Sequence, residues 1–453
     1  MVVILAAGLG TRMKSSIPKV LHKIYGKPMV KYVIDAVRQL LPENIIVVIG
    51  HSDNKSSNEI QNAIKECSVT FAIQKEPKGT ADALKSAVKH LKGFNGTILV
   101  LSGDTPLIAI ESLRKFLRLH KQQREDLSVM SFMVDDIHSY GRIIRENGKP
   151  VAIIENKDAQ ESQKNIKEVN SGIYAIKSGL LSLLKDIKIN EKKGEYYLTD
   201  ILDIAVKKGF RAGVHALGNE TELTGINTRH ELYKAVHYLR DKILNKFFNE
   251  GVSFIDSKST FIHPDVKIGM DTVIYPNVYI EGNTTIGNNC IILPGARITD
   301  SMIGNNVVIK DYTVIESSTI SDKAAVGPFA HVRLGSLIGR SVKIGNFVEI
   351  KKSTIGEGTK ASHLSYLGDA EIGKNVNIGA GTITCNYDGK KKHKTTIEDD
   401  VFVGSNTQLI APVRVGKGAY IGAGSTITKD VPPQSLAISR TKQKNIEKWA
   451  VKK

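Results

Sequence analysis

The chain has 453 residues, of which 41% are hydrophobic and 24% are charged, a composition typical of folded globular domains. It has no apolar run near the ~20 residues that a membrane-spanning helix needs, and its apolar stretch at residues 2–7 is too short for a signal-peptide core, so we expect a cytoplasmic protein without a membrane partner. The net charge of +17 favours anionic partners, but scattered Lys and Arg, only 6% aromatic residues and the lack of a nucleic-acid-binding motif favour small phosphorylated ligands over nucleic acid.

The first half of the chain alternates between short β-rich runs and longer amphipathic stretches. The β-rich runs are residues 2–6, 45–49, 69–73 and 98–101. This alternation predicts an α/β, Rossmann-like domain with a mostly parallel sheet over residues 1–227. Residues 228–250 then carry apolar side chains at helical spacing inside a charged segment, which predicts a long linker helix.

The second half, residues 251–453, has a sequence period of six. From Ile262 an aliphatic residue recurs every sixth position, with a small residue four positions later and occasional five-residue steps. This period is typical of a hexapeptide parallel β-helix, in which three hexads form one coil, and it predicts about nine coils. The repeat stops at Cys385, gives way to a Lys-rich loop, and resumes after Thr395.

One loop near the start of the chain has residues suited to phosphate. The segment ILAAGLGTRMKSSIPK, residues 4–19, places Gly8 and Gly10 after a buried strand and follows them with Arg12 and Lys19. Glycines let backbone N–H groups approach phosphate oxygens, and the two cations offset their charge. These residues alone fit a phosphate cradle and a plain strand-to-helix turn about equally well, because neither a Walker A motif nor a complete GxGxxG is present.

The wider pattern resembles a known family. LAAGxGTRM with a Pro-Lys pair, a strand ending in Gly103-Asp104, and later Glu155, Asn170 and Asn227 resemble sugar-nucleotide pyrophosphorylases. Joined to hexapeptide repeats, the chain resembles over its whole length the bacterial bifunctional N-acetylglucosamine-1-phosphate uridyltransferase and glucosamine-1-phosphate N-acetyltransferase family. The resemblance implies that the β-helix winds left-handed and that the chain forms a homotrimer.

For the first domain the resemblance implies uridyl transfer from UTP. The attacking sugar phosphate is already anionic, so the reaction requires cations and a metal ion rather than a general base. Arg12 and Lys19 are expected to act on the triphosphate, and Asp104 and Asn227 to bind Mg²⁺, although an Asp after a strand is often a helix cap. Gln74, Gly79 and Thr80 are expected to contact uracil, and Gly141, Glu155 and Asn170 the N-acetylglucosamine. The complete expected set for UTP and UDP-N-acetylglucosamine is Leu5, Ala6, Ala7, Gly8, Lys19, Gln74, Gly79, Thr80, Gly103, Asp104, Gly141, Glu155, Asn170 and Asn227. Ser102 departs from the family, where Tyr often precedes Gly-Asp.

Counting hexads places two cations on successive coils of the second domain. Arg333 and Lys351 are expected to stack ~5 Å apart, a spacing at which they repel unless an anion lies between them. A substrate phosphate is one counterion, and solvated side chains that splay apart are the alternative. Gly368 occupies the same position on the next coil, and its lack of a side chain is expected to leave room for that phosphate. Leu334 replaces a Pro that often follows the matching Arg in the family.

His363 is expected to face outward, because Ala361 and Ser365 occupy the inward positions of its hexad. A lone His is more often a surface or packing residue than a catalyst. The amine of glucosamine 1-phosphate must lose a proton before it attacks a thioester, however, and an imidazole suits that task. The family assigns proton acceptance to the matching His, with Arg333, Lys351, Tyr366 and Asn377 holding the sugar phosphate.

The loop at 385–395 explains the interruption, since a flat β-helix side cannot enclose an acyl donor. In the family it reaches a neighbouring subunit, and the expected acetyl-CoA contacts are Ala380, Asn386, Tyr387, Ser405, Ala423 and Arg440. Its lysines are expected either to bind anions or to be solvated. Cys67, Cys290 and Cys385 are an odd set without CxxC spacing, which predicts free thiols. Cys385 lacks a visible base, which disfavours an acetyl-enzyme. The tail 440–453 is expected to contain a short helix.

The sequence thus predicts acetyl transfer from acetyl-CoA to glucosamine 1-phosphate in the second domain, followed by uridyl transfer from UTP in the first. The product, UDP-N-acetylglucosamine, feeds peptidoglycan and lipopolysaccharide. One alternative is a monofunctional sugar-1-phosphate nucleotidyltransferase with a structural β-helix, which would lack the Arg333, Lys351, His363 and Asn386 set. Another is a non-enzymatic regulatory subunit, which would not need the Gly8, Arg12, Lys19 and Asp104 set.

Overall fold

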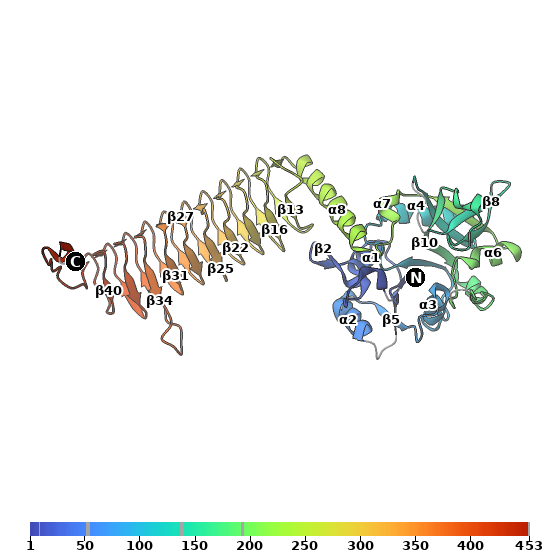
Figure 1. Ribbon diagram of the computed structural model, residues 1–453, viewed down its shortest axis with the longest axis horizontal. Coiled ribbons are helices and arrows are strands. Elements are labelled where there is room, and N and C mark those ends of the chain that lie inside the picture. Colours follow the sequence, from blue (N-terminus) through green and yellow to red (C-terminus); the bar gives the residue numbers. More distant parts are fainter. Residues whose placement is uncertain (9, 51–54, 136–139, 192–193, 452–453) are drawn as a thin grey trace. The chain divides into compact units, whose positions relative to one another are not determined.

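The computed structural model of the chain describes residues 1–453 except 9, 51–54, 136–139, 192–193 and 452–453. The chain divides into two compact units, Met1–Leu239 and Arg240–Lys453 (Figure 1). No described helix is long and apolar enough to cross a membrane.

The first unit is built on a mixed sheet with the strand order β11-β7-β10-β6-β1-β4-β5. Its strands are β1 (Val2–Leu5), β4 (Ile45–Ile49), β5 (Thr70–Ile73), β6 (Thr97–Ser102), β7 (Leu127–Met133), β10 (Glu168–Lys177) and β11 (Ala212–Ala216). Strands β1, β4, β5 and β6 are parallel, whereas β10 is antiparallel to both β6 and β7. Strands β8 (Arg142–Glu146) and β9 (Lys149–Ile154) form a hairpin that pairs with β10 through β8. A small hairpin, β2 (Lys23–Ile24) and β3 (Lys27–Pro28), stands apart.

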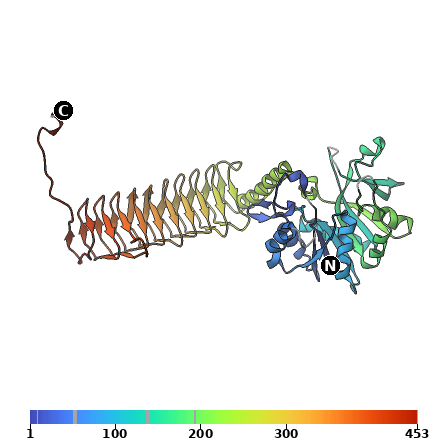
Figure 2. The ribbon, with the colours of Figure 1, turned by 60° about the horizontal axis from the view of Figure 1, so that its bottom comes forward.

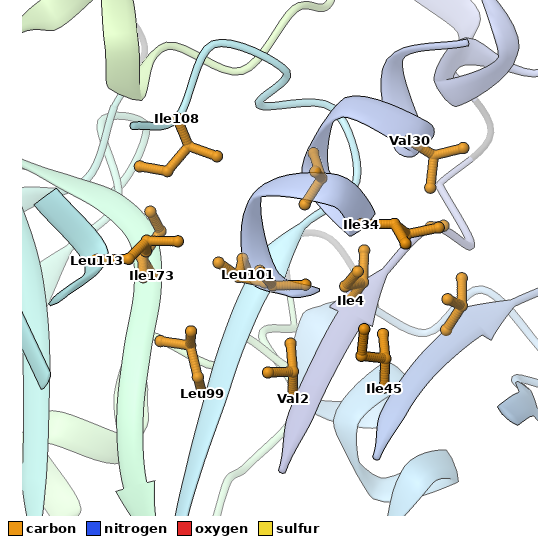
Figure 3. Packing of buried hydrophobic residues seen from close by; sticks show 14 of the residues in the cluster. Val2, Ile4, Val30, Ile34, Ile45, Leu99, Leu101, Ile108, Leu113 and Ile173 are labelled. Atoms are coloured by element: carbon orange, nitrogen blue, oxygen red, sulfur yellow. The ribbon is translucent and has the colours of Figure 1, made fainter. Parts of the chain in front are cut away.

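Helices cover both faces of this sheet, because its strands carry apolar side chains on both faces. The helices are α1 (Met29–Arg38), α2 (Lys55–Ile64), α3 (Thr80–Ala87), α4 (Ile110–Gln122), α5 (Glu161–Lys164), α6 (Asp200–Lys207) and α7 (Glu220–Leu223). On one face Val2 and Ile4 of β1 pack with residues of α1, α2 and α4, and Figure 3 shows part of this cluster. On the other face Val3 packs with residues of α3 and α6. The predicted α/β class is confirmed.

The second unit is a left-handed parallel β-helix made of three sheets. The first sheet runs from β12 (Ser253–Phe254) to β41 (Leu436–Ala437), the second from β13 (Phe261–Ile262) to β40 (Thr426–Ile427), and the third from β14 (Lys267–Ile268) to β38 (Val413–Val415). They contain 11, 10 and 9 strands, which corresponds to about ten coils rather than the expected nine. The aliphatic residues of the period-six pattern and the small residues between them are buried, as for Ile262, Val266 and Thr272.

Two corners of this β-helix carry residues that the sequence analysis predicts as site residues. We call the turns from the first to the second sheet corner A, and those from the second to the third sheet corner B. Corner A places Tyr312, Phe329, Phe347 and Leu364 in the left-handed backbone region, with φ of 52°, 53°, 56° and 42°. Bulky side chains are uncommon in this region. Leu334 lies at corner B with φ 57°, a conformation that proline cannot adopt, so this turn differs from one that carries the Pro common in the family.

Helix α8 (Arg229–Asn249) runs across the boundary between the two units. After β41 the chain continues as an extended tail that ends in a single 3-10 turn, Trp449–Val451 (Figure 2). The helix expected in the tail is therefore limited to that turn.

Candidate active sites

The first unit contains a cavity of about 830 Å³ at the carboxyl ends of β1 and β6, where open α/β sheets bind ligands. Predicted residues on its wall are Leu5, Ala6, Ala7, Gly8, Arg12, Lys19, Gln74, Gly79, Thr80, Asp104, Glu155 and Asn227. Gly103, Gly141 and Asn170 do not line it. Gly103 instead donates its N–H to the carbonyl of Leu5 (2.9 Å), which fixes the end of β6 against β1.

The glycine loop packs closely on Lys19. Gly10 has φ 63°, and a Cβ there would lie 2.6 Å from Cβ of Lys19, so only glycine fits this position. A Cβ at Gly8 would meet no atom within 4 Å, which leaves the backbone beside it open to the cavity. A short 3-10 turn, Thr11–Met13, then presents Arg12 as an exposed side chain on the cavity wall. The described residues Gly8, Gly10 and Arg12 thus leave space on the cavity wall for a phosphate group.

Lys19 lies between the two predicted metal ligands. Its ammonium forms an ion pair with the buried carboxylate of Asp104 and donates a hydrogen bond to Oδ1 of Asn227 (3.0 Å). The amide nitrogen of Asn227 donates to the carbonyl of Gly225 (2.9 Å), which leaves Oδ1 directed at the Lys19 ammonium. Two oxygens that converge on one cationic atom also suit Mg²⁺, which prefers oxygen ligands and keeps several waters or phosphate oxygens.

The predicted uracil contacts form a connected group. Gln74 is buried and donates from Nε2 to the carbonyl of Gly79 (3.1 Å) and to Oδ2 of Asp82 (2.9 Å). Both amide hydrogens are therefore used, and Oε1 is left as the acceptor. Gly79 has φ 99°, and a Cβ there would lie 2.6 Å from the carbonyl oxygen of Tyr196. The hydroxyl of Thr80 accepts from the N–H of Leu198 (3.0 Å).

The predicted sugar contacts lie where β8, β9 and β10 meet. The N–H of Asn170 donates to the carbonyl of Gly141 (2.9 Å), and a Cβ built on Gly141 would lie 3.5 Å from Oε1 of Glu155. The register of β10 shifts between Asn170 and Ile173, a bulge that re-aims the Asn170 side chain. Burial raises the pKa of Glu155, so this carboxyl group is protonated more readily than an exposed one.

In the second unit the predicted cation register is present. Arg333 of β25 (His331–Arg333) lies beside Lys351 of β28 (Glu349–Lys351), and Lys351 beside Gly368 of β31 (Tyr366–Gly368). Arg333 already has a counterion, because its guanidinium forms an ion pair with Glu349 (2.5 Å) that sequence reasoning missed. The space over Gly368 is not open, since a Cβ there would lie 2.4 Å from the hydroxyl of Tyr366.

The interrupting loop forms a hairpin at corner B. It leaves β34 (Ile383–Cys385), stands out from the β-helix in Figure 1, and returns to β35 (Thr395–Ile397). Tyr387 pairs antiparallel with Lys392, and the carboxylate of Asp388 accepts from the N–H groups of Lys390 (2.7 Å) and Lys391 (2.6 Å).

The hairpin brings Lys392 to Lys351. The Lys351 ammonium, through a side-chain contact and charge repulsion, lowers the pKa of Lys392. Asn386 donates to Oδ2 of Asp369 (2.5 Å) and lies 3.5 Å from the hydroxyl of Tyr366. Of the alternatives for the loop lysines, an anion site fits Lys392, whereas Lys394 pairs with Glu371.

His363 ends β30 (Lys360–His363) at corner A and is exposed. Its register partner on the preceding coil is Asn346, whose Oδ1 lies 2.8 Å from Nδ1 of His363. An amide oxygen only accepts, so Nδ1 is the donor in this contact, and in the neutral ring Nε2 is then the acceptor. Asn346 lies 17 positions before His363, which is one coil that contains a single five-residue step. This spacing in the sequence could have identified Asn346 as the neighbour of His363.

The predicted acetyl-CoA residues fall into two groups. Ala380, Ser405 and Ala423 follow each other along corner A, because Asn406 N–H donates to Ala380 (2.7 Å) and Gly424 N–H to Ser405 (2.8 Å). The guanidinium of Arg440 donates to the carbonyl of Ala423 (2.5 Å) and extends this row. Asn386 and Tyr387 instead lie on the hairpin at corner B. Asn377 begins β33 (Asn377–Ile378) on the first sheet, beside Lys360.

In a single chain the residues predicted for acetyl transfer therefore lie mainly in two groups, at the two corners that flank the second sheet. His363 and the acetyl-CoA row lie at corner A, and the cations with the hairpin lie at corner B. Cys385 is a free thiol whose pKa is raised by burial, which makes it a poorer nucleophile and agrees with the prediction that it forms no acetyl-enzyme. Cys67 and Cys290 are also free, as expected.

Comparison with known proteins finds relatives of both units of the chain. Residues 1–219 match the nucleotidyl transferase family model, residues 257–346 the GMPPB C-terminal domain, and residues 394–429 the bacterial transferase hexapeptide model. A protein named Bifunctional protein GlmU from Thermodesulfovibrio yellowstonii is 55% identical over 453 residues, covering 100% of this chain and 99% of that one. Proteins of the same name from Geotalea uraniireducens and Caldanaerobacter subterraneus subsp. tengcongensis are 46% and 48% identical, over 100% and 99% of this chain and 98% and 96% of theirs.

Proposed function

The chain belongs to the family of bifunctional GlmU proteins, and we propose that its two reactions take place at the two groups of residues described above. It is a bifunctional enzyme that acetylates glucosamine 1-phosphate from acetyl-CoA and then couples the product to UTP, releasing pyrophosphate. The residue roles are our proposal. The observation that supports them best is that both chemistries have a dedicated set of groups, Lys19 with Asp104 in one unit and Lys351 with Lys392 in the other.

In uridyl transfer the phosphate of N-acetylglucosamine 1-phosphate attacks the α-phosphorus of UTP in line, and pyrophosphate leaves. Asp104 and Asn227 would hold Mg²⁺, which supplies positive charge to the phosphates. Lys19 and Arg12 offset the remaining negative charge, and the backbone beside Gly8 approaches the phosphate oxygens. Oε1 of Gln74 accepts a hydrogen bond from an N–H of the base, and Glu155 accepts from sugar hydroxyls. No residue needs to remove a proton.

In acetyl transfer the phosphate of the amino sugar binds to Arg333, Lys351 and Lys392. Nε2 of His363 takes a proton from the ammonium group, and the free amine then attacks the thioester carbonyl. Collapse of the tetrahedral intermediate breaks the carbon–sulfur bond, and the protonated His363 gives its proton to the departing coenzyme A thiolate. The neutral imidazole then takes the second proton from the nitrogen and releases it to water, so the amide, the free thiol and one proton are the products. One acyl bond forms and one breaks, so no further reactant is required.

We propose that the chain works as a homotrimer in the cytoplasm, where its substrates are found. Phe329 stacks between Tyr312 and Phe347 at corner A, with ring centroids 5.2 and 5.5 Å apart, and all three side chains are about half exposed. Exposed apolar stripes of this kind mark interaction surfaces. A second copy seated on corner A would cover the stripe and bring its own corner B, with Lys351 and the hairpin, to His363.

The rival hypotheses make different demands. A monofunctional nucleotidyltransferase would not need His363 with an oriented Nδ1, nor Lys392 next to Lys351. A regulatory subunit would not need Lys19 between two metal ligands. The residues present favour the bifunctional enzyme over both.

The test is product analysis by mass spectrometry with glucosamine 1-phosphate, acetyl-CoA, UTP and Mg²⁺, each omitted in turn. We expect N-acetylglucosamine 1-phosphate without UTP, and UDP-N-acetylglucosamine only in the complete mixture. His363→Ala should abolish the acetylated product yet still convert supplied N-acetylglucosamine 1-phosphate to UDP-N-acetylglucosamine. Lys19→Ala should still form N-acetylglucosamine 1-phosphate but should not couple it to UTP. Loss of both activities in either folded variant would contradict the two-site assignment.

A further inference from the structure

A buried charge that the mechanism above does not use lies next to the residues predicted to bind the sugar. Arg142, the first residue of β8, is fully buried with a relative exposure of 0%. An arginine this deeply buried is rare unless its charge is paired or hydrogen-bonded. Its place in the fold therefore requires an explanation.

The backbone of Arg142 touches all three predicted sugar-binding segments. Its register partners are Ile154 on β9 and Val169 on β10. Each partner directly precedes a predicted sugar residue, Glu155 or Asn170, and Arg142 itself directly follows Gly141. One strand position thus connects three segments that are otherwise distant in the sequence.

The side chain of Arg142 fastens two of these segments together, those of Gly141 and Glu155. Its guanidinium donates to the carbonyl of Tyr140, next to Gly141, and to Oδ1 of Asn156 (2.9 Å), next to Glu155. Its Nε also donates to the carbonyl of Lys164 (3.4 Å). A planar guanidinium holds several acceptors in one fixed arrangement, which a lysine ammonium does not reproduce.

We infer that Arg142 is a positioning residue for the sugar phosphate: its buried guanidinium holds the Gly141 and Glu155 segments in register and keeps a positive charge beside the Glu155 carboxylate. The inference rests on the proposed function, since it concerns the same sugar site.

Electrostatics around Glu155 support this role. Burial is the largest effect and raises the pKa of Glu155, the carboxylates of Asp200 and Asp158 raise it further, and the charge of Arg142 lowers it. Among these charged neighbours Arg142 is the cation that favours the ionised form, which is the form that accepts hydrogen bonds from sugar hydroxyls. Removing that charge should leave Glu155 protonated at higher pH than in the wild type.

The test compares Arg142→Met, Arg142→Lys and the matched control Arg145→Met in the full chain. Arg145 lies on the same strand, but it pairs with Glu168 and is a third exposed. Initial rates of pyrophosphate release are measured with N-acetylglucosamine 1-phosphate or UTP varied, across acidic to mildly basic pH. Thermal unfolding and acetyl transfer are recorded for each variant.

We expect Arg142→Met to raise KM for the sugar phosphate roughly tenfold to a hundredfold, the range for a lost charged hydrogen bond. Its KM for UTP should stay within about twofold, its acetyl transfer should be unchanged, and the acidic limb of its pH profile should move to higher pH. Arg142→Lys should return the acidic limb toward its wild-type position while KM for the sugar phosphate stays raised. Arg145→Met should match the wild type.

Equal increases in both KM values, or an Arg142→Met enzyme equal to Arg145→Met, would overturn the inference. If Arg142→Met does not fold, Arg142→Lys decides, since a wild-type KM for the sugar phosphate in that variant contradicts the guanidinium clamp. A wild-type protein without uridyl transfer would instead refute the proposed function itself.

Discussion

The contact between His363 and Asn346 gives the sharpest test of the acetyl-transfer site. We predict that Asn346→Ala lowers kcat for acetyl transfer without removing it. Asn346 contributes its side-chain oxygen at 2.8 Å from Nδ1 of His363, while its backbone carbonyl, which accepts from Leu364 N–H (2.9 Å), is unchanged by the substitution. The change therefore removes one side-chain hydrogen bond and leaves the coil intact.

The expected size of the effect follows from that single bond. A hydrogen bond contributes about 0.5–1.5 kcal/mol, and a tenfold change in rate corresponds to about 1.4 kcal/mol, so kcat should fall about 2- to 12-fold. Loss of the base itself should cost about 10²- to 10⁴-fold, so His363→Ala must be far more severe. Asn346→Asp retains an acceptor for Nδ1–H and should recover most of the activity.

The assay is release of the coenzyme A thiol, measured with a chromogenic thiol reagent, and uridyl transfer by the same preparation serves as the control for folding. An Asn346→Ala enzyme as fast as the wild type would show that this contact does not select the tautomer of His363. An enzyme as slow as His363→Ala would show that Asn346 acts on the substrate directly. Either result would refute the reasoning.

Three further predictions concern the backbone, the pH response and assembly. Gly79→Ala should reduce uridyl transfer at least tenfold and leave acetyl transfer unchanged, because the new Cβ would lie 2.6 Å from the carbonyl oxygen of Tyr196. Uridyl transfer is measured as pyrophosphate release, and a fully active variant would contradict the prediction. Burial lowers the pKa of His120, whose Nδ1 lies 2.6 Å from Oγ of Ser128, so the unfolded chain binds more protons than the folded one and stability should fall as the pH drops below 6.5. Hydrogen exchange should therefore show that helix α4 loses less protection in acid in His120→Gln than in the wild type. An equal loss in the variant and the wild type would refute this. Phe329→Lys should shift sedimentation from trimer to monomer and abolish only acetyl transfer, whereas an intact trimer would exclude this corner as the interface.

Much of the fold could be predicted because its two periodicities are strong. The period of six placed the inward side chains correctly and set the register that brings Arg333 beside Lys351. The coil number was underestimated because the strands at both ends, β12 at Ser253–Phe254 and β41 at Leu436–Ala437, lie outside the regular aliphatic run. End coils lack neighbours on one side, so their sequences follow the repeat less strictly.

The sites could be predicted only in part, because their partners are distant in the sequence or lie outside the repeat. Lys19 and Asn227 are separated by 208 positions, and no local pattern indicates that one ammonium joins Asp104 to Asn227. Glu349 could have been found, since it shares a strand with Lys351 and faces the same way. The approach of Lys392 to Lys351 could not, because it depends on the fold of a hairpin without a repeat.

That hairpin explains why a regular β-helix interrupts itself at this point. Along one register column the coils offer Arg333, Lys351 and then Gly368, one side chain for each strand spacing of about 4.8 Å. Such a column can approach a phosphate from one side only, and Arg333 is already partly neutralised by Glu349. The insertion leaves at Cys385, on the coil after Gly368, and returns Lys392 to Lys351 from outside the coil. The insertion thereby adds a third cation to the two of the column, and an anion bound between Lys351 and Lys392 would offset their mutual repulsion.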